Sequence, residues 1–233
     1  QEELELDFGY QDKEVRFRVN FHQQQEKIGM AARLIPHEIP NPEDLRFEPV
    51  LNDFTNLLNG LVLVVGPTGH GKSTTLASMI EEINKTRKSH IITIEDPVEY
   101  RLNKITQVEV NELAGLTFSN ALRSFLRQDP DIVMVGEIRD QETAKIAARA
   151  AQTGHLVLTT LHSNNVFEAI NRLRNLGIES DDIASSLKLA VSQRLLTRLC
   201  SCDNAKSCKV CYGKGTHGRI PVLEMLEMEP SIK

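Results

Sequence analysis

The feature that most constrains the fold of this chain is the stretch LVLVVGPTGHGKSTTLASMI, residues 61–80. It opens with apolar residues, breaks into glycines around Lys72, and resumes with the apolar spacing of a helix. An apolar run that ends in glycines indicates a buried strand entering a tight loop, because glycine adopts backbone angles that other residues avoid. The stretch therefore predicts a strand, a loop and a helix in immediate succession.

The same alternation continues along the chain from residue 56. Apolar runs such as HIITIE, DIVMVGE and HLVLTTL alternate with helical patterns such as TFSNALRSFLRQ and QETAKIAARAAQTG. Continuous apolar strands between helices are typical of a parallel sheet covered on both faces. We predict an α/β domain over residues 56–233, with Asp140 and Asn165 as helix N-caps and a last long amphipathic helix from Asp181 to Leu199.

A different pattern precedes this domain. Residues 14–21, EVRFRVNF, alternate polar and apolar side chains as a half-buried strand does, and IGMAARLI is a candidate partner strand. The stretch IPHEIPNPEDLRFEP holds four prolines, which oppose regular helix and sheet. We therefore predict a small amino-terminal domain over residues 1–38 and a linker over residues 39–55.

Composition excludes several classes of protein. With 233 residues, 40% of them apolar and 25% charged, the chain has the make-up of an ordinary globular protein. Its apolar runs are too short to cross a bilayer, and its start does not resemble a signal peptide. A net charge of -5 argues against a general nucleic-acid surface. We expect a cytoplasmic protein with no nucleic-acid partner.

The octapeptide GPTGHGKS fits the phosphate-binding motif G-x-x-x-x-G-K-[ST], and it lies where that motif must lie, between a strand and a helix. Such a loop points several backbone N–H groups inward, and the helix adds its positive dipole end. Lys72 would reach the β- and γ-phosphates of ATP, and the Ser73 hydroxyl would ligate magnesium. The alternative is a chance glycine-rich turn. The predicted nucleotide-binding residues are Gly66, Pro67, Thr68, Gly69, His70, Gly71, Lys72, Ser73 and Thr74.

Two apolar strands deliver acidic residues to the edge where open α/β sheets bind ligands. DIVMVGEIRD ends in Glu137, and IITIEDPVEY ends in Glu95 and Asp96, with Pro97 stopping the strand. We predict Glu137 as general base with Glu95 in support. The alternative for both is that they cap the next helix.

Histidines flank a further strand in TGHLVLTTLHSNN. His162 follows the strand, on the edge of the phosphate loop, and is placed to sense the γ-phosphate. His155 precedes the strand, so its side chain is expected farther from the nucleotide. The alternative for both is a structural role, which is also the interpretation for His22, His37, His70, His90 and His217.

All four cysteines lie in residues 200–211, a spacing that suits one metal site better than dispersed disulfides. Cys208 and Cys211 have the usual spacing of a zinc knuckle, whereas Cys200 and Cys202 are separated by one residue only. Four thiolates would close a structural zinc site with no open position for water. The alternative is a loop of free thiols.

Four stretches together carry a resemblance to a known family: GPTGHGKSTTLASMI, IITIEDPVEY, GLTFSNALRSFLRQDPDIVMVGEIRD and TGHLVLTTLHSNN. They resemble, in order, the Walker A, Asp box, Walker B and His box of the secretion ATPase superfamily that drives type II secretion and type IV pili. The resemblance spans residues 14–228. It implies a RecA-like ATPase domain, an amino-terminal PAS-like α+β domain, a hexameric ring and an inner-membrane platform protein as partner.

The resemblance also implies roles for individual residues. Glu95 matches the Asp-box acid, Glu137 the Walker B glutamate, and His155 and His162 the His-box pair. RFRVN and AARLIP resemble segments whose arginines reach the phosphates when the domains close, and Arg18 and Arg33 are the matching positions. Without the resemblance, a solvated strand face is the preferred interpretation for both arginines. The PAS-like domain of the relatives is longer, so the chain is expected to be part of a longer protein.

The resemblance does not decide whether the motor assembles pili, retracts them or drives type II secretion. The cysteine cluster and GRIPVLEML look like the pilus-assembly and type II secretion branches, whereas RFRVN and RLIPHEIP look like the retraction branch. We predict a motor for pilus assembly at the cytoplasmic side of the inner membrane. Pilus retraction and type II secretion are the alternatives within the family. An ATP-binding scaffold without turnover and a ring helicase are alternatives from other classes.

Overall fold

The computed structural model describes residues 5–13, 15–35, 39–43, 45, 53–202 and 204–229. His37 and much of the predicted linker lie outside these residues, so the division of the chain at residues 39–55 stays a prediction.

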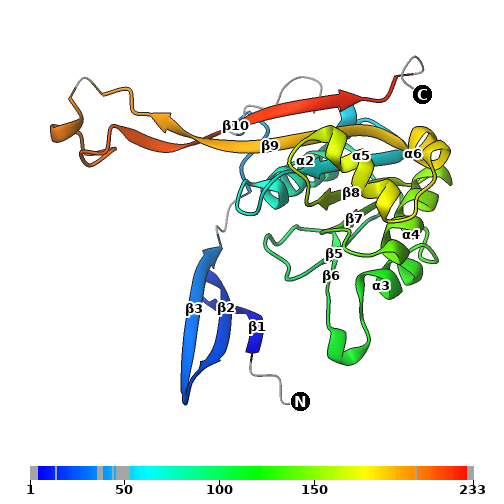
Figure 1. Cartoon of the computed structure of the whole chain (residues 1–233), viewed down its shortest axis with the longest axis horizontal. Coiled ribbons are helices and arrows are strands. Elements are labelled where there is room, and N and C mark those ends of the chain that lie inside the picture. Colours follow the sequence, from blue (N-terminus) through cyan, green and yellow to red (C-terminus); the bar gives the residue numbers. More distant parts are fainter. Residues whose placement is uncertain are drawn as a thin grey trace.

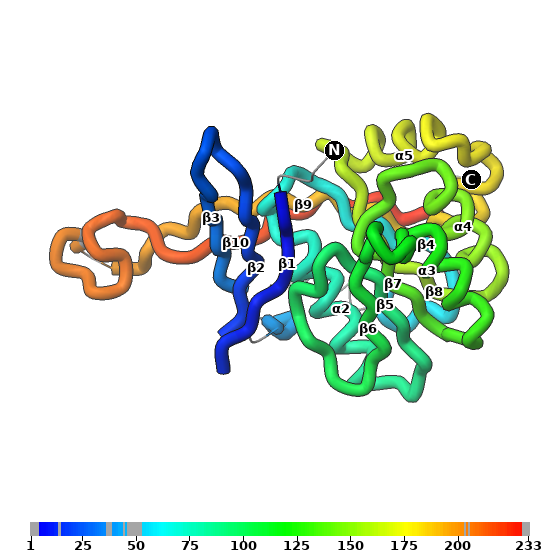
Figure 2. Tube along the Cα trace, turned by 90° about the horizontal axis from the view of Figure 1, so that it is seen from below, coloured from blue at the N-terminus to red at the C-terminus, as the bar shows by residue number. Residues whose placement is uncertain are grey.

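The amino-terminal unit is a three-stranded antiparallel sheet in the order β1-β2-β3. Its strands are β1 (Glu5–Asp12), β2 (Val15–Gln24) and β3 (Lys27–Ile35), which confirms the predicted strand pair. Since side chains alternate between faces, one face collects apolar residues and the other collects Arg16, Arg18 and Arg33. Figures 1 and 2 show this small sheet beside the large domain, on the side where a long ribbon leaves it.

The large domain is built on a seven-stranded sheet in the order β10-β9-β4-β8-β7-β5-β6. Every neighbouring pair is parallel except β9 with β10. The strands are β4 (Gly60–Val65), β5 (Ile91–Glu95), β6 (Thr106–Glu109), β7 (Ile132–Val135), β8 (Leu156–Leu161), β9 (Leu187–Leu199) and β10 (Thr216–Glu227). The predicted α/β class is confirmed.

Helices cover both faces of this sheet. They are α2 (Lys72–Thr86), α3 (Phe118–Phe125), α4 (Gln141–Gln152), α5 (Val166–Asn175) and α6 (Ser180–Ser186), with short 3-10 turns η1 (Glu112–Ala114) and η2 (Ala205–Ser207). Both predicted N-caps are confirmed, because the Asp140 side chain accepts from the Thr143 N–H and the Asn165 side chain from the Glu168 N–H.

The core lies in two layers that the pleat of β4 separates. Every residue of β4 is buried. Val62 and Val64 pack with α2, whereas Leu61, Leu63 and Val65 pack with α3, α4, α5 and α6. Burial on both faces explains why β4 reads as a continuous apolar run rather than an alternating one.

The predicted helix from Asp181 to Leu199 is wrong. Only Ser180–Ser186 is helical, and the chain then continues as β9, which pairs with β4 in parallel and with β10 in antiparallel fashion. The amphipathic pattern of this stretch does not exclude a strand, and its pairing with two distant strands outweighs a weak local preference for helix.

Beyond the body of the domain β9 and β10 continue as a two-stranded ribbon, and Figure 1 shows it reaching well past the helices. The cysteine-bearing loop lies at its far end. The cysteines are therefore remote from the carboxyl edge of the sheet.

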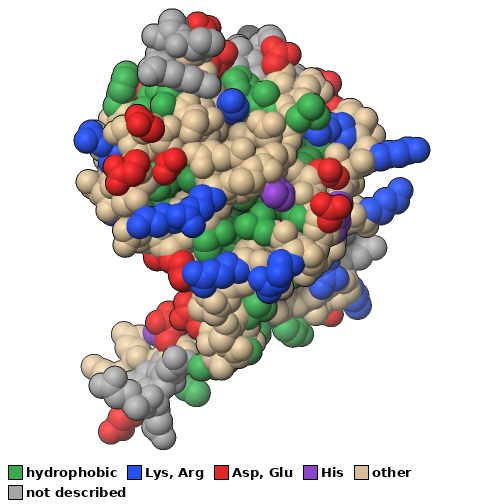
Figure 3. All heavy atoms as spheres, turned by 90° about the vertical axis from the view of Figure 1, so that its right-hand side faces the viewer, with side chains coloured by type: hydrophobic (Ala, Val, Ile, Leu, Met, Phe, Trp, Pro, Cys, Tyr) green, Lys and Arg blue, Asp and Glu red, His purple; other side chains and the backbone are tan. Residues whose placement is uncertain are grey.

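The surface of the large domain is mixed in charge. The face turned to the viewer in Figure 3 carries Lys and Arg side chains close to Asp and Glu side chains, as solvated surfaces do. Among the described residues, no helix is long and apolar enough to cross a membrane.

Candidate phosphate-binding site

The loop between β4 and α2 has the backbone of a phosphate cradle. Gly69 and Gly71 take left-handed φ angles of 77° and 83°, which curl the chain back before the helix begins. Gly71 is the N-cap of α2, no side chain caps the helix, and its first turn holds no acid. The first N–H groups of α2 and its positive dipole end therefore stay available to an anion.

Lys72 is folded back into this loop. Its side chain is buried, and its Nζ donates to the Gly66 carbonyl at 2.9 Å and to the Pro67 carbonyl at 3.1 Å. Burial lowers the pKa of Lys72, while the charges of Glu137 and Glu99 act in the opposite direction. Phosphate oxygens are stronger acceptors than these carbonyls because they are charged, so an anion in the loop would draw the ammonium group toward itself.

Glu137 lies just past the end of β7, as predicted, and has Arg139 and His162 as neighbours. Its Oε2 lies 3.2 Å from Nε2 of His162, which follows β8, and its Oε1 accepts from Arg139. Arg139 also pairs with Asp96 at 3.3 Å, so it links the ends of β5 and β7. These contacts raise the pKa of Arg139, first through its hydrogen bond to Glu137.

Glu95 ends β5 in a nearly closed environment. The Thr93 hydroxyl donates to its Oε1 at 2.7 Å and the Gln107 amide at 3.2 Å. Burial raises the pKa of Glu95, and these two hydrogen bonds oppose the rise only in part. Gln107 also binds the backbone at Tyr100 and Leu102, so it ties the acid to the loop that follows β5.

The arginine face of the small sheet turns toward the same place. Arg18 and Arg33 are register partners on β2 and β3, and both line the cavity above the phosphate loop. Asp7 holds the Arg18 guanidinium through Nε and Nη2, which raises the pKa of Arg18. Arg16 makes the direct contact with the large domain, because it donates to the carbonyls of Val98 and Glu99.

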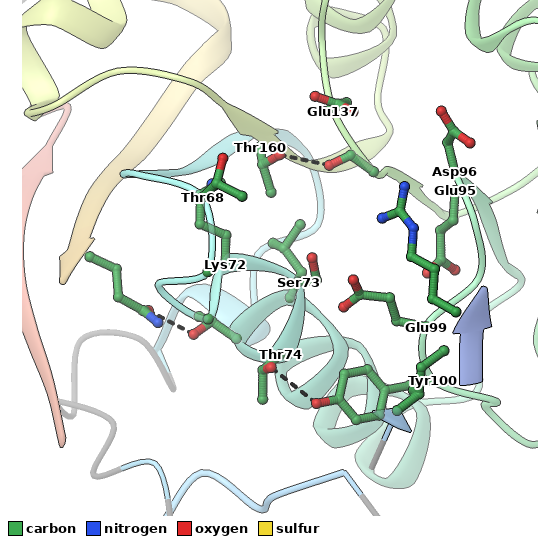
Figure 4. Close-up of a pocket in the computed structure, with 18 of the residues that line it drawn as sticks. Thr68, Lys72, Ser73, Thr74, Glu95, Asp96, Glu99, Tyr100, Glu137 and Thr160 are labelled. Carbon is green, nitrogen blue, oxygen red and sulfur yellow. Dashed lines mark hydrogen bonds between the residues drawn. The ribbon is translucent and has the colours of Figure 1, made fainter. Parts of the chain in front are cut away.

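These elements enclose one cavity of about 660 Å³. Figure 4 shows Thr68, Lys72 and Ser73 on one side of it, across from Glu95, Asp96 and Glu99, with Glu137 and Thr160 at its rim. A cavity of this size, with polar groups converging from several strand ends, is typical of a small-molecule site. The remaining predicted residues that line it are Arg18, Arg33, Gly69, Gly71, Thr74 and His162.

Four predicted residues are absent from this lining. His155 is absent from the lining of this cavity and holds the start of β8, with its Nδ1 3.1 Å from the Ala150 carbonyl. Gly66 and Pro67 line a second, smaller hollow on the other side of the loop, which His162 also borders. His70 turns its ring toward β9, where Nδ1 accepts from the Leu195 N–H at 2.9 Å.

Sequence reasoning missed Arg16, Gln107, Arg139 and Gln193. The only signal was the position of Arg139 two residues after Glu137. Arg16 and Gln193 act through contacts between segments that are far apart in the chain, and Gln107 acts across the loop that joins β5 to β6.

The cysteine loop brings four thiols together with the spacing of a metal site. The Sγ atoms of Cys200 and Cys208 lie 3.8 Å apart, as do those of Cys202 and Cys211, and all four lie within 4.8 Å of one another. A tetrahedral zinc with bonds of about 2.3 Å requires sulfur atoms about 3.8 Å apart. Backbone N–H groups of Cys211 and Val210 lower the pKa of Cys208 to about 6. The four thiols fit zinc despite the short spacing of the first pair.

The fold and the site together define the class of protein. A phosphate loop, acids at the ends of two neighbouring strands and a covered parallel sheet belong to the P-loop nucleotide-binding proteins. A family model described as Type II/IV secretion system protein matches residues 10–233. The chain belongs to this family.

Individual relatives agree with this assignment. The chain is 52% identical over 173 residues to a protein transport protein HofB homolog of Haemophilus influenzae, which covers 73% of this chain and 37% of that protein. It is 57% identical over 146 residues to the type IV pilus assembly ATPase PilB of Acinetobacter baylyi, which covers 63% of this chain and 25% of that protein. The chain thus spans less than half of these relatives.

Solved structures show the same fold. The pilus retraction motor PilT with bound ADP is 38% identical, has a TM-score of 0.84, and covers 98% of this chain and 65% of that chain. The ATPase DotB of Legionella pneumophila is 26% identical with a TM-score of 0.78, and covers 98% of this chain and 64% of that chain.

The raised pKa of Glu95 predicts a cost in stability. Below a pH of about 4.5, the ordinary value for a glutamate, the carboxyl is protonated in the folded and the unfolded chain and costs nothing. As the pH rises, the unfolded chain ionises first, so the penalty grows until the folded carboxyl also ionises. Glu95→Gln is expected to raise the melting temperature at pH 7.5 by about 2–4 °C, the change that about 1 kcal/mol produces in a chain of this size.

Thermal unfolding followed by circular dichroism measures the melting temperature at pH 7.5 and at pH 4. Glu112→Gln, at an exposed position on η1, is the matched control and should change the melting temperature at neither pH. A gain at pH 7.5 that persists undiminished at pH 4 would contradict the role of the Glu95 charge.

Proposed function

We propose that this chain is the nucleotide-binding and catalytic part of an ATP-hydrolysing motor that powers type IV pilus assembly. One observation carries the proposal. The phosphate loop, the strand-end acids and two arginines of the amino-terminal sheet all line one cavity.

The residues of the loop would bind the phosphates. Inward N–H groups and Lys72 would hold the β- and γ-phosphates, and Ser73 would hold the magnesium that neutralises part of their charge. Thr68 of the loop and Thr74 of the first turn of α2 line the same cavity.

Glu137 would act as the general base toward water. Its position beside His162 and Arg139 keeps the carboxylate oriented, and His162 is placed to sense the γ-phosphate. Glu95 has the supporting role, since its buried carboxyl faces the cavity from the neighbouring strand end. Glu95 is the last residue of β5, and Glu137 lies two residues after the end of β7, so both acids are positioned by the sheet.

Arg18 and Arg33 would stabilise the charge that develops on the phosphates. They come from the amino-terminal sheet, so their distance to the loop depends on how the two parts of the chain close. Hydrolysis would then be coupled to domain movement, because the stabilising charge arrives only in the closed form.

The assembly role is favoured by the cysteine cluster, which resembles the assembly and type II secretion branches. The 57% identity to a pilus assembly ATPase points the same way. A type II secretion ATPase is the second candidate, because a type II secretion system protein E of Aeromonas hydrophila is 50% identical over 151 residues. We further propose a homo-hexamer that acts at the cytoplasmic face of the inner membrane on a platform protein.

We further propose a structural zinc at the far end of the ribbon formed by β9 and β10. Cys200, Cys202, Cys208 and Cys211 would hold it, and a bound zinc with four thiolates cross-links the ends of β9 and β10 without offering a site for water. Its role in this proposal is structural.

The first test separates binding from turnover. Glu137→Gln is expected to bind ATP as the wild type does but to lose at least about 100-fold in kcat, because the base is missing while the loop is intact. Lys72→Ala is expected to lose binding itself. Calorimetric titration with ATP and a phosphate-release assay measure the two effects.

Glu112→Gln serves as the control for loss of a carboxylate and should leave both values unchanged. Unchanged hydrolysis in Glu137→Gln would remove this residue as the base. ATP binding by the wild type without any turnover would favour the scaffold alternative.

A second test concerns the metal. Protein purified without chelator is expected to hold about one zinc per chain, because four thiolates satisfy one tetrahedral ion. Elemental analysis gives the content, and a thiol reagent should label the cysteines only after chelation. Cys202→Ser should lower the zinc content with the rest of the chain folded. Metal-free protein with four freely titrating thiols would contradict the site.

A third test addresses the direction of work. Deletion of the gene in its native host, followed by electron microscopy of surface pili, is expected to abolish pili. An excess of long pili would identify a retraction motor instead. Unchanged pili with loss of secreted proteins would identify the type II secretion role.

A further inference from the structure

Gln193 on β9 is a buried polar residue that the mechanism above does not use. Its side chain belongs to a strand that carries no predicted site residue, yet it spans the gap between that strand and the phosphate loop. The amide Nε2 donates to the His70 carbonyl at 2.8 Å, and Oε1 accepts from the Thr75 hydroxyl of α2 at 2.7 Å. The amide nitrogen is thus hydrogen-bonded to the loop, and the amide oxygen is hydrogen-bonded to the helix that follows it.

The position of Gln193 explains why this contact is available. The parallel pairing of β4 with β9 ends at Val65 and Ser192, because β4 there turns into the phosphate loop. From Gln193 onward β9 stays paired with β10, but its opposite edge faces the loop instead of a strand. The next loop-facing group, the Leu195 N–H, donates to the His70 ring, and Arg219 of β10 donates to the Gly69 carbonyl at 3.3 Å.

Two loop glycines also fit against Gln193. A Cβ at Gly66 would lie 2.4 Å from the Gln193 carbonyl oxygen, and a Cβ at Gly71 would lie 2.9 Å from its Nε2. A Cβ atom cannot lie that close to another heavy atom. Gln193 therefore fits in this position because residues 66 and 71 are glycines. The backbone of the loop is therefore packed directly against Gln193, which also borders the cavity.

This packing matters for anion binding because it fixes the direction of the loop's peptide groups. Such a loop binds phosphate only when its N–H groups point inward, which requires its carbonyls to point outward and to find donors there. Gln193 and Arg219 supply donors for two consecutive carbonyls, those of His70 and Gly69. Without the Gln193 donor, the His70 carbonyl is free to turn, and a carbonyl turned inward repels a phosphate.

We propose that Gln193 is a positioning residue for the phosphate loop, which it holds in its anion-binding shape from the ribbon side. The inference rests on the proposed ATP-binding function and names a residue on which that function depends. The ribbon is then the support of the phosphate cradle as well as the carrier of the cysteine loop.

The test compares nucleotides that differ in their phosphates. Gln193→Met keeps the length of the side chain and removes both hydrogen bonds. It is expected to weaken binding of ATP and ADP about tenfold, the loss typical of one buried hydrogen bond, while AMP, which has no β-phosphate to place in the cradle, changes little. Calorimetry on the whole chain measures the three dissociation constants, and thermal unfolding measures stability.

Ser186→Ala is the matched control. Ser186 is equally buried at the end of α6, directly before β9, and its hydroxyl donates to the Asp182 carbonyl, far from the loop. Its variant should lower the melting temperature without changing any dissociation constant. A Gln193→Met protein that behaves in the same way, with the ratio of ATP to AMP affinity unchanged, would overturn the inference.

Thr75→Val keeps the proposal testable if Gln193→Met does not fold. This variant leaves the Gln193 amide in place but removes its anchor on α2, and it should weaken ATP and ADP binding with AMP spared. The double variant should bind ATP no more weakly than Gln193→Met alone, because both changes act through one contact. Failure of the wild type to bind ATP would refute the proposed function instead, and it is measured before any variant.

Discussion

The parallel pairing of β4 with β8 on one side and β9 on the other is the interaction on which the rest of the structure depends. Parallel strands bring their carboxyl ends to one edge, so the phosphate loop, His162 and Gln193 meet there although they are far apart in the chain. The neighbouring strands β7 and β5, on the far side of β8, add Glu137 and Glu95 to the same edge. The chemistry of the site follows from this alignment, since no single segment carries more than part of it.

The amino-terminal sheet depends on a second constraint, the alternation of side chains along a strand. Arg16, Arg18 and Arg33 share one face, and that face is the one turned toward the cavity. Arg16 donates hydrogen bonds to two carbonyls of the loop after β5, while the other two arginines line the cavity. A contact that joins the parts of the chain therefore lies next to groups proposed to touch phosphate, which suits a motor in which closure and chemistry are coupled.

Much of the site could be predicted because its signals are local. A phosphate loop needs glycines and a lysine at set spacings, and strand-end acids follow apolar runs that are easy to find. The error over residues 187–199 has the opposite cause. This stretch is a strand because it pairs with β4, which lies far away in the chain, and with β10, and no local pattern indicates either partner. Arg16 and Gln193 were missed for the same reason, because each bonds to a segment far away in the chain. Gln107 bonds to closer residues, but no local pattern shows which groups its amide reaches.

The sequence by itself determined the α/β class, the phosphate loop, Glu137 and Glu95 as strand-end acids, and the family to which the chain belongs. These depend on short segments whose residue types and spacing have direct physical meaning. Only the tertiary structure decided that β9 is a strand between β4 and β10 and that Gln193 contacts the phosphate loop. It also decided that His155 lies outside the cavity lining and that the four unevenly spaced cysteines lie close together. Each of these depends on distances between segments, and such distances are set by packing and strand pairing rather than by local order in the chain.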